Sequence, residues 1–153
     1  MVGFEDLKSL SSDFTEEYCK AINENSDYAK AARGWGVGFE GSILYIMEAS
    51  GEIEDDISIY MDLKDGKCLS IKLLAPNKEP QRKPGLIIRG SLVIWNKIAT
   101  RKITAMNAIM SGKLKLEGQI NLIMRYSQAA MILAKIAGKQ KFFKILFNQF
   151  NLT

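Results

Sequence analysis

Four carboxylates stand close together in the chain, at Glu52, Glu54, Asp55 and Asp56. Paired carboxylates can bind calcium or serve as general acid and base, so this cluster is the first candidate for chemistry. A dedicated calcium loop spaces its Asp and Asn ligands around a glycine, and that spacing is missing here. The cluster also falls between two predicted strands. We therefore interpret it as a solvated turn.

Glycines at positions 34, 36 and 38 surround Trp35 and form a second candidate. A glycine-rich turn that holds phosphate follows a strand and begins a helix. Here the order is reversed, because helical sequence precedes the glycines and a strand follows them. We interpret the segment as a connection in which Trp35 packs against the core.

Two cysteines and the absence of histidine limit the chemistry further. A chain of 153 residues can fold without a disulfide, so we expect Cys19 and Cys68 to be free thiols in a cytoplasmic protein. Without histidine, the chain lacks the commonest general base, the usual partner of Ser or Cys nucleophiles and the commonest transition-metal ligand. The sequence predicts a protein that is not an enzyme and has no metal or other cofactor.

The bulk composition indicates one ordinary domain over residues 1–153. The net charge of +4 permits contact with an anionic membrane surface. Lysines and arginines are spread through the chain rather than arranged in a basic stripe, so we expect no nucleic-acid partner. No apolar run approaches the roughly 20 residues of a membrane span, and residues 1–6 lack the pattern of a secretory signal.

The first half of the chain predicts helices followed by a three-stranded meander. Helical sequence runs from near Asp13 to Arg33, in two pieces. A strand at 42–49 is apolar on both faces, and strands at 57–63 and 68–73 alternate, which indicates one buried face each. In the last strand, Leu69, Ile71 and Leu73 are expected to point inward and Cys68 outward. Asp65-Gly66 predicts the tight turn between these strands.

The second half predicts a strand at 86–89 and a helix that begins at Ser91 as N-cap. A short helix around Met106 and Met110 follows. Residues 113–117 alternate between charged and apolar side chains, which predicts a short strand bracketed by Gly112 and Gly118. Residues 119–137 then form one broadly apolar helix, which Gly138 ends.

Residues 110–118, Met-Ser-Gly-Lys-Leu-Lys-Leu-Glu-Gly, resemble the Met-Ser-Gly-Lys-Leu-Lys block of the sterol-carrier-protein (type two) family, in its stand-alone prokaryotic form. Residues 95–98 and 120–124 add to the resemblance. It implies an α+β fold in which a mainly antiparallel five-stranded sheet packs against helices. It also implies an apolar cavity or tunnel for lipid tails.

The helix at 119–137 must be covered over most of its surface, by core or by an apolar ligand. If a cavity lies there, its predicted walls come from the three helical segments between residues 92 and 137. The predicted ligand-binding residues are Ile94, Trp95, Ile98, Met106, Ile109, Met110, Leu122, Ile123, Tyr126, Ala130 and Leu133. Ordinary core packing is the alternative for each of them. Arg101, Lys102 and Arg125 are candidates to hold an anionic head group.

The C-terminal segment carries a second apolar stripe at helical spacing. Its members are Phe142, Phe143, Leu146, Phe147 and Phe150, flanked by lysines. Such a stripe fits a lid over a tunnel mouth, transient contact with a membrane surface, a homodimer interface or packing within its own domain.

The leading hypothesis is non-catalytic binding, and transfer, of a lipid, fatty acyl or other elongated apolar ligand in an internal cavity. The alternative is a solid-cored module that dimerises or binds a partner through the C-terminal aromatic stripe. A third hypothesis is an enzyme that acts on lipids, with Asp55 or Asp56 as the titrating group.

Overall fold

The computed structural model describes residues 2–10, 13–51 and 53–149. A five-stranded sheet has the order β3-β2-β1-β4-β5. β1 and β4 are parallel, and the other neighbours are antiparallel. The strands are β1 (Ile43–Glu48), β2 (Ile57–Lys64), β3 (Lys67–Leu74), β4 (Leu86–Ser91) and β5 (Leu114–Glu117). The predicted α+β class with a mainly antiparallel sheet is confirmed.

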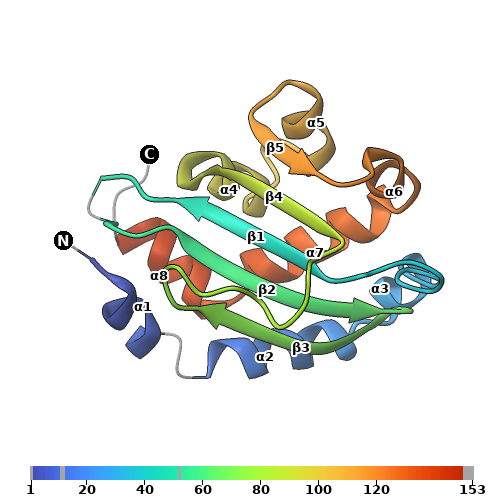
Figure 1. Ribbon diagram of the computed structural model, residues 1–153, viewed down its shortest axis with the longest axis horizontal. Coiled ribbons are helices and arrows are strands. Elements are labelled where there is room, and N and C mark those ends of the chain that lie inside the picture. The colour runs from blue at the N-terminus through green and yellow to red at the C-terminus, as the bar shows by residue number, and fades with distance from the viewer. Residues whose placement is uncertain (1, 11–12, 52, 150–153) are drawn as a thin grey trace.

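Helices cover one face of this sheet (Figure 1). They are α1 (Phe4–Leu10), α2 (Phe14–Asn23), α3 (Ser26–Ala31), α4 (Leu92–Ala99), α5 (Ala105–Met110), α6 (Ile120–Arg125), α7 (Ser127–Gly138) and α8 (Lys141–Gln149). α2 and α3 lie along the β3 side, while α7 and α8 run behind the centre of the sheet. No helix in the described ranges is long and apolar enough to cross a membrane.

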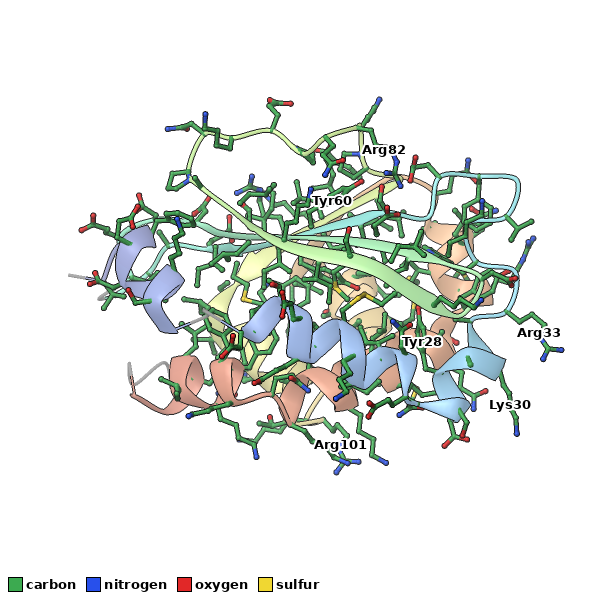
Figure 2. All side chains as sticks on the ribbon, turned by 90° about the horizontal axis from the view of Figure 1, so that it is seen from below. Tyr28, Lys30, Arg33, Tyr60, Arg82 and Arg101 are labelled. Atoms are coloured by element: carbon green, nitrogen blue, oxygen red, sulfur yellow. A yellow bond between two sulfur atoms is a disulfide. The ribbon has the colours of Figure 1, made fainter. Side chains whose placement is uncertain are left out.

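The opposite face of the sheet is covered by the loop between β3 and β4 (Figure 2). Beneath it, Leu44, Ile46 and Tyr60 form a small second core. The Arg82 guanidinium holds the loop in place through ion pairs of 2.8 Å to Glu40 and 2.7 Å to Asp62. Alternate residues of β1 therefore face either the helix layer or the loop.

The turn between β2 and β3 is as predicted, and Ile71 and Leu73 face the core as expected, but the start of β3 does not. Asp65 and Gly66 both have positive φ, at 50° and 80°, as a tight hairpin turn requires. However, Cys68 is buried (5% exposed) and Leu69 is 57% exposed, the reverse of the expected alternation. A register shift places Leu69 opposite no partner, between the pairs Asp62↔Ser70 and Leu63↔Cys68. This irregularity inverts the alternation at the start of the strand.

The expectation of free thiols is wrong, because Cys19 and Cys68 form a disulfide across a sequence separation of 49. The bond joins α2 to β3. Asn23 reinforces the same junction: its side chain donates to the Cys68 carbonyl at 2.9 Å and accepts from the Cys68 N–H at 2.8 Å. The inward position of Cys68 after the register shift is what brings its sulfur to the helix.

The predicted long apolar helix is two helices, α6 and α7, which meet at Tyr126. The backbone of Tyr126 (φ −108°, ψ 29°) leaves the helical region. Its ring packs edge-on against Trp35, with ring centroids 5.2 Å apart. A Cβ at Gly34 would lie 2.9 Å from the Tyr126 hydroxyl, so this approach needs a glycine there. Trp35 is therefore a packing anchor, as predicted.

Candidate functional site

A cavity of about 100 Å³ lies between the sheet and the helices. The sheet contributes its helix-facing side chains, namely Ile43, Tyr45, Met47, Ile59, Met61, Leu63 and Ile88. Both tryptophans of the chain, Trp35 and Trp95, also reach it. Charged side chains are absent from the described lining, so the cavity suits an uncharged apolar group.

The space exists because α7 presents small side chains to the sheet. Ala129, Ala130, Ala134 and Ala137 line the cavity where larger residues would close it. Leu133 is the large exception on this helix face. Alanine stabilises the helix but is too small to fill the space between α7 and the sheet, so that space remains as the cavity.

Seven of the eleven predicted ligand-binding residues line the cavity: Trp95, Ile98, Ile109, Ile123, Tyr126, Ala130 and Leu133. The other four do not line it. Ile94, Met106 and Leu122 are partly buried and pack against the core, and Met110 is 68% exposed at the end of α5. Met110 ends its helix just before the turn at Gly112, which leaves its side chain on the surface.

Tyr18, Tyr28 and Tyr45 were not predicted, although they are three of the four tyrosines in the described lining. Burial raises the pKa of Tyr28 to about 12. Burial also raises the pKa of Tyr18 and Tyr45, and the neighbouring phenols raise both further. The strand alternation of β1 could have indicated Tyr45, since Ile43 and Met47 share its face. The two helical tyrosines gave no such signal.

The C-terminal stripe packs within its own chain. Phe142, Phe143, Leu146 and Phe147 are all buried. Phe143 and Phe147 line the cavity, so α8 forms part of its wall. Phe150 lies outside the described residues.

The candidate head-group residues Arg101, Lys102 and Arg125 are exposed, and none of them lines the cavity. Figure 2 shows Arg101 pointing away from the helix layer into solvent. Arg101 has a positive φ of 62° in the turn after α4. These side chains could therefore contact only a part of the ligand that projects out of the cavity into solvent.

The acidic cluster has structural partners. The Asp55 carboxylate accepts from the Phe4 N–H at 3.3 Å. The Asp56 carboxylate accepts from the Ala49 N–H at 2.8 Å and from Arg89 at 3.1 Å. No group of three or more potential metal ligands occurs in the part of the chain that the structure describes, and Glu52 lies outside it. These contacts agree with the interpretation as a turn.

The segment that contains the sheet also matches a known protein family in sequence. Residues 44–131 match the model of the SCP-2 sterol transfer family. The chain belongs to this family. The match includes β1 to β5 and continues into α7, so it contains most of the cavity wall, whereas α2, α3 and α8 lie outside it. No curated protein matches the chain in sequence.

Solved structures of the family are similar over most of their length. A crystal structure of sterol carrier protein 2 is 27% identical, with a TM-score of 0.70, and the match covers 82% of this chain and 93% of that one. A conserved hypothetical protein from Thermus thermophilus, described as a candidate sterol carrier protein, is 28% identical. Its TM-score is 0.68, with 80% and 82% covered. Sterol carrier protein domain 2 of Helicoverpa armigera is 15% identical with a TM-score of 0.55, covering 82% and 88%, and shows the fold alone.

Proposed function

We propose that the protein binds, and transfers, a lipid, fatty acyl or other elongated apolar ligand whose tail occupies the cavity. The observation that carries this proposal is the cavity itself, closed by apolar side chains in a fold of the SCP-2 sterol transfer family. Each buried methylene contributes about 0.8 kcal/mol, so a long tail binds at micromolar affinity or better after the costs of association.

The size of the cavity requires movement on binding. An engineered cavity of about 150 Å³ in another protein accepts benzene, so the cavity of about 100 Å³ here holds only a short part of a tail. A longer chain needs the helices to move away from the sheet. α8 is the natural candidate, because its Phe143 and Phe147 form part of the cavity wall. In this proposal α8 acts as the lid.

The proposed activity is non-catalytic. The polar groups of the described lining are hydroxyls, backbone groups and indole N–H groups. General acid–base catalysis near neutral pH needs a group with a pKa near 7. The pKa of tyrosine is ordinarily about 10, and burial raises it further for Tyr18, Tyr28 and Tyr45. Binding and release then follow from burial of the tail alone, without a cofactor.

Transfer requires contact with a donor or acceptor surface. The net charge of +4 favours transient contact with an anionic membrane. Lys141 and Lys144 are exposed on α8, so the lid helix itself can present positive charge to such a surface. We place this exchange in the cytoplasm. A reducing cytoplasm would keep Cys19 and Cys68 as thiols, so the fold would have to be stable there without the disulfide.

Native mass spectrometry of the purified protein, followed by organic extraction, tests the proposal. A stoichiometric lipid adduct, or uptake of palmitate on challenge, is the expected result. An apo mass that takes up no acyl chain and no sterol would contradict it. The same spectra report the oligomeric state, and a dimer without ligand would favour the alternative interaction module.

A further inference from the structure

Three tyrosines from three separate elements reach the cavity: Tyr18 from α2, Tyr28 from α3 and Tyr45 from β1. Tyr18 and Tyr28 are only 4% and 1% exposed. Phenol groups in an apolar wall are costly unless they find hydrogen-bond partners. An apolar residue would satisfy the packing pattern at each of these three positions, so the phenol groups call for a separate explanation.

Hydrogen bonding distinguishes the three phenols. The Tyr18 hydroxyl donates to the Leu133 carbonyl at 3.4 Å. Among the described residues, no hydrogen bond uses the hydroxyl of Tyr28 or of Tyr45. Both side chains line the cavity, and neither hydroxyl is committed to another described residue. Phenols donate well to carbonyl and hydroxyl oxygens.

The absence of charge from the described cavity lining favours an uncharged ligand oxygen over a carboxylate. No cationic side chain lines the described cavity, so a carboxylate carried inward would be buried without a counter-ion. A phenol is already protonated at neutral pH, and burial raises the pKa of both tyrosines further. They therefore act as neutral donors, and the oxygen that they suit is itself uncharged.

We propose that Tyr28 and Tyr45, with Tyr18 beside them, form a polar subsite that binds the neutral carbonyl or hydroxyl oxygen of the ligand. The preferred ligands are then neutral lipids that carry such an oxygen inward, ahead of plain hydrocarbons and of chains that enter with a carboxylate. This inference rests on the proposed function, since it names the class of molecule that the same cavity selects.

Matched probes and matched variants test the subsite. The probes are methyl tetradecyl ketone, hexadecane and palmitate, which share chain length and differ in the oxygen group. Trp35 and Trp95 both line the cavity, so intrinsic tryptophan fluorescence reports binding of all three. The variants are Tyr28→Phe and Tyr45→Phe, which remove a hydroxyl and keep the ring. Tyr60→Phe is the control, because its buried hydroxyl has no partner among the described residues and lies on the loop side of the sheet (Figure 2).

The ketone is expected to bind wild type more tightly than hexadecane or palmitate. Loss of one net hydrogen bond lowers affinity by about threefold to tenfold, so each cavity variant should lose that much for the ketone and nothing for hexadecane. Tyr60→Phe should match wild type for every probe. If one cavity variant fails to fold, the other carries the test.

The two proposals fail in different ways. Equal affinity of wild type for the ketone and hexadecane, or unchanged ketone binding in both cavity variants, would overturn the subsite while leaving lipid binding intact. Absence of binding by every probe would overturn the proposed function and the subsite together.

Discussion

The ring of Phe14 on α2 stacks on the ring of Phe142 on α8, with centroids 4.3 Å apart. This contact joins α2 to α8. The next residue, Phe143, meets the Phe14 ring edge-on and also lines the cavity. Opening the cavity by moving α8 must therefore break this aromatic contact.

Replacing Phe142 by Leu should loosen the lid. Loss of the stacked pair costs about 0.5–1.5 kcal/mol beyond the area effect, so the free energy of unfolding should fall by at least that amount. Ligand release, measured by stopped-flow fluorescence, should become faster. Phe39→Leu is the control, since Phe39 packs edge-on against Trp35 and not on α8. Equal release rates in wild type and both variants would contradict the role of α8.

The disulfide should contribute substantially to stability. A bond that closes a loop of 49 residues stabilises by about 4 kcal/mol in the chain-entropy model. Urea unfolding of the oxidised protein should therefore show a higher midpoint than the reduced protein. The double variant Cys19→Ala, Cys68→Ala should not respond to reductant. Two titratable thiols in the oxidised, unfolded protein would show that the bond does not form.

The loop ion pair should make stability depend on acid pH. Hydrogen bonds from Arg82 lower the pKa of Glu40 from 4.5 to about 2. A carboxylate with a lowered pKa stabilises the fold above its unfolded value, and this contribution is lost as the pH falls from 4.5 toward about 2. Arg82→Met should therefore be less stable than wild type at neutral pH. The difference should shrink over that interval in urea unfolding, and a constant difference would argue against the pairing.

The buried phenols should make stability depend on alkaline pH. The unfolded chain releases the Tyr28 proton near pH 10.0, whereas the folded protein holds it to about 12. A raised pKa means that stability is complete below the unfolded value and is lost as the pH rises through the folded one. Ultraviolet difference titration of the folded protein should show that Tyr28, Tyr18 and Tyr45 form phenolate above the ordinary tyrosine range. A single transition at the ordinary tyrosine pKa in folded protein would contradict their burial.

The sequence predicts elements better than it predicts faces. The strand that begins at Leu114 and the cap at Ser91 follow from local signals, and both are present; the Ser91 hydroxyl accepts from the Ile94 N–H at 3.3 Å. The inversion at Leu69 depends on a register shift against Asp62, a neighbour in the sheet that a periodicity of two cannot detect. Pairing of Cys19 with Cys68 follows from that same shift. α1 was not predicted: it has only seven residues, too few for apolar spacing to indicate a helix.

The cavity is harder to predict than the fold because a core residue and a wall residue have the same chemistry. Ile98 and Ile123 line the cavity while Ile94 and Leu122 do not, and all four are apolar residues on helices. The predicted single helix is divided at Tyr126, whose ring contacts Trp35, a residue distant in sequence.

If the cavity is the ligand site, a side chain that fills it should abolish binding. Ala129 is buried on α7 and lines the cavity, so Ala129→Leu places a larger apolar side chain in that space at a cost of about 1–3 kcal/mol. Ala29→Leu, at an exposed position on α3, is the control. A fluorescence titration with methyl tetradecyl ketone should show saturable binding by wild type and Ala29→Leu, and strongly weakened binding by folded Ala129→Leu. Unchanged affinity of folded Ala129→Leu would show that the ligand binds outside the cavity.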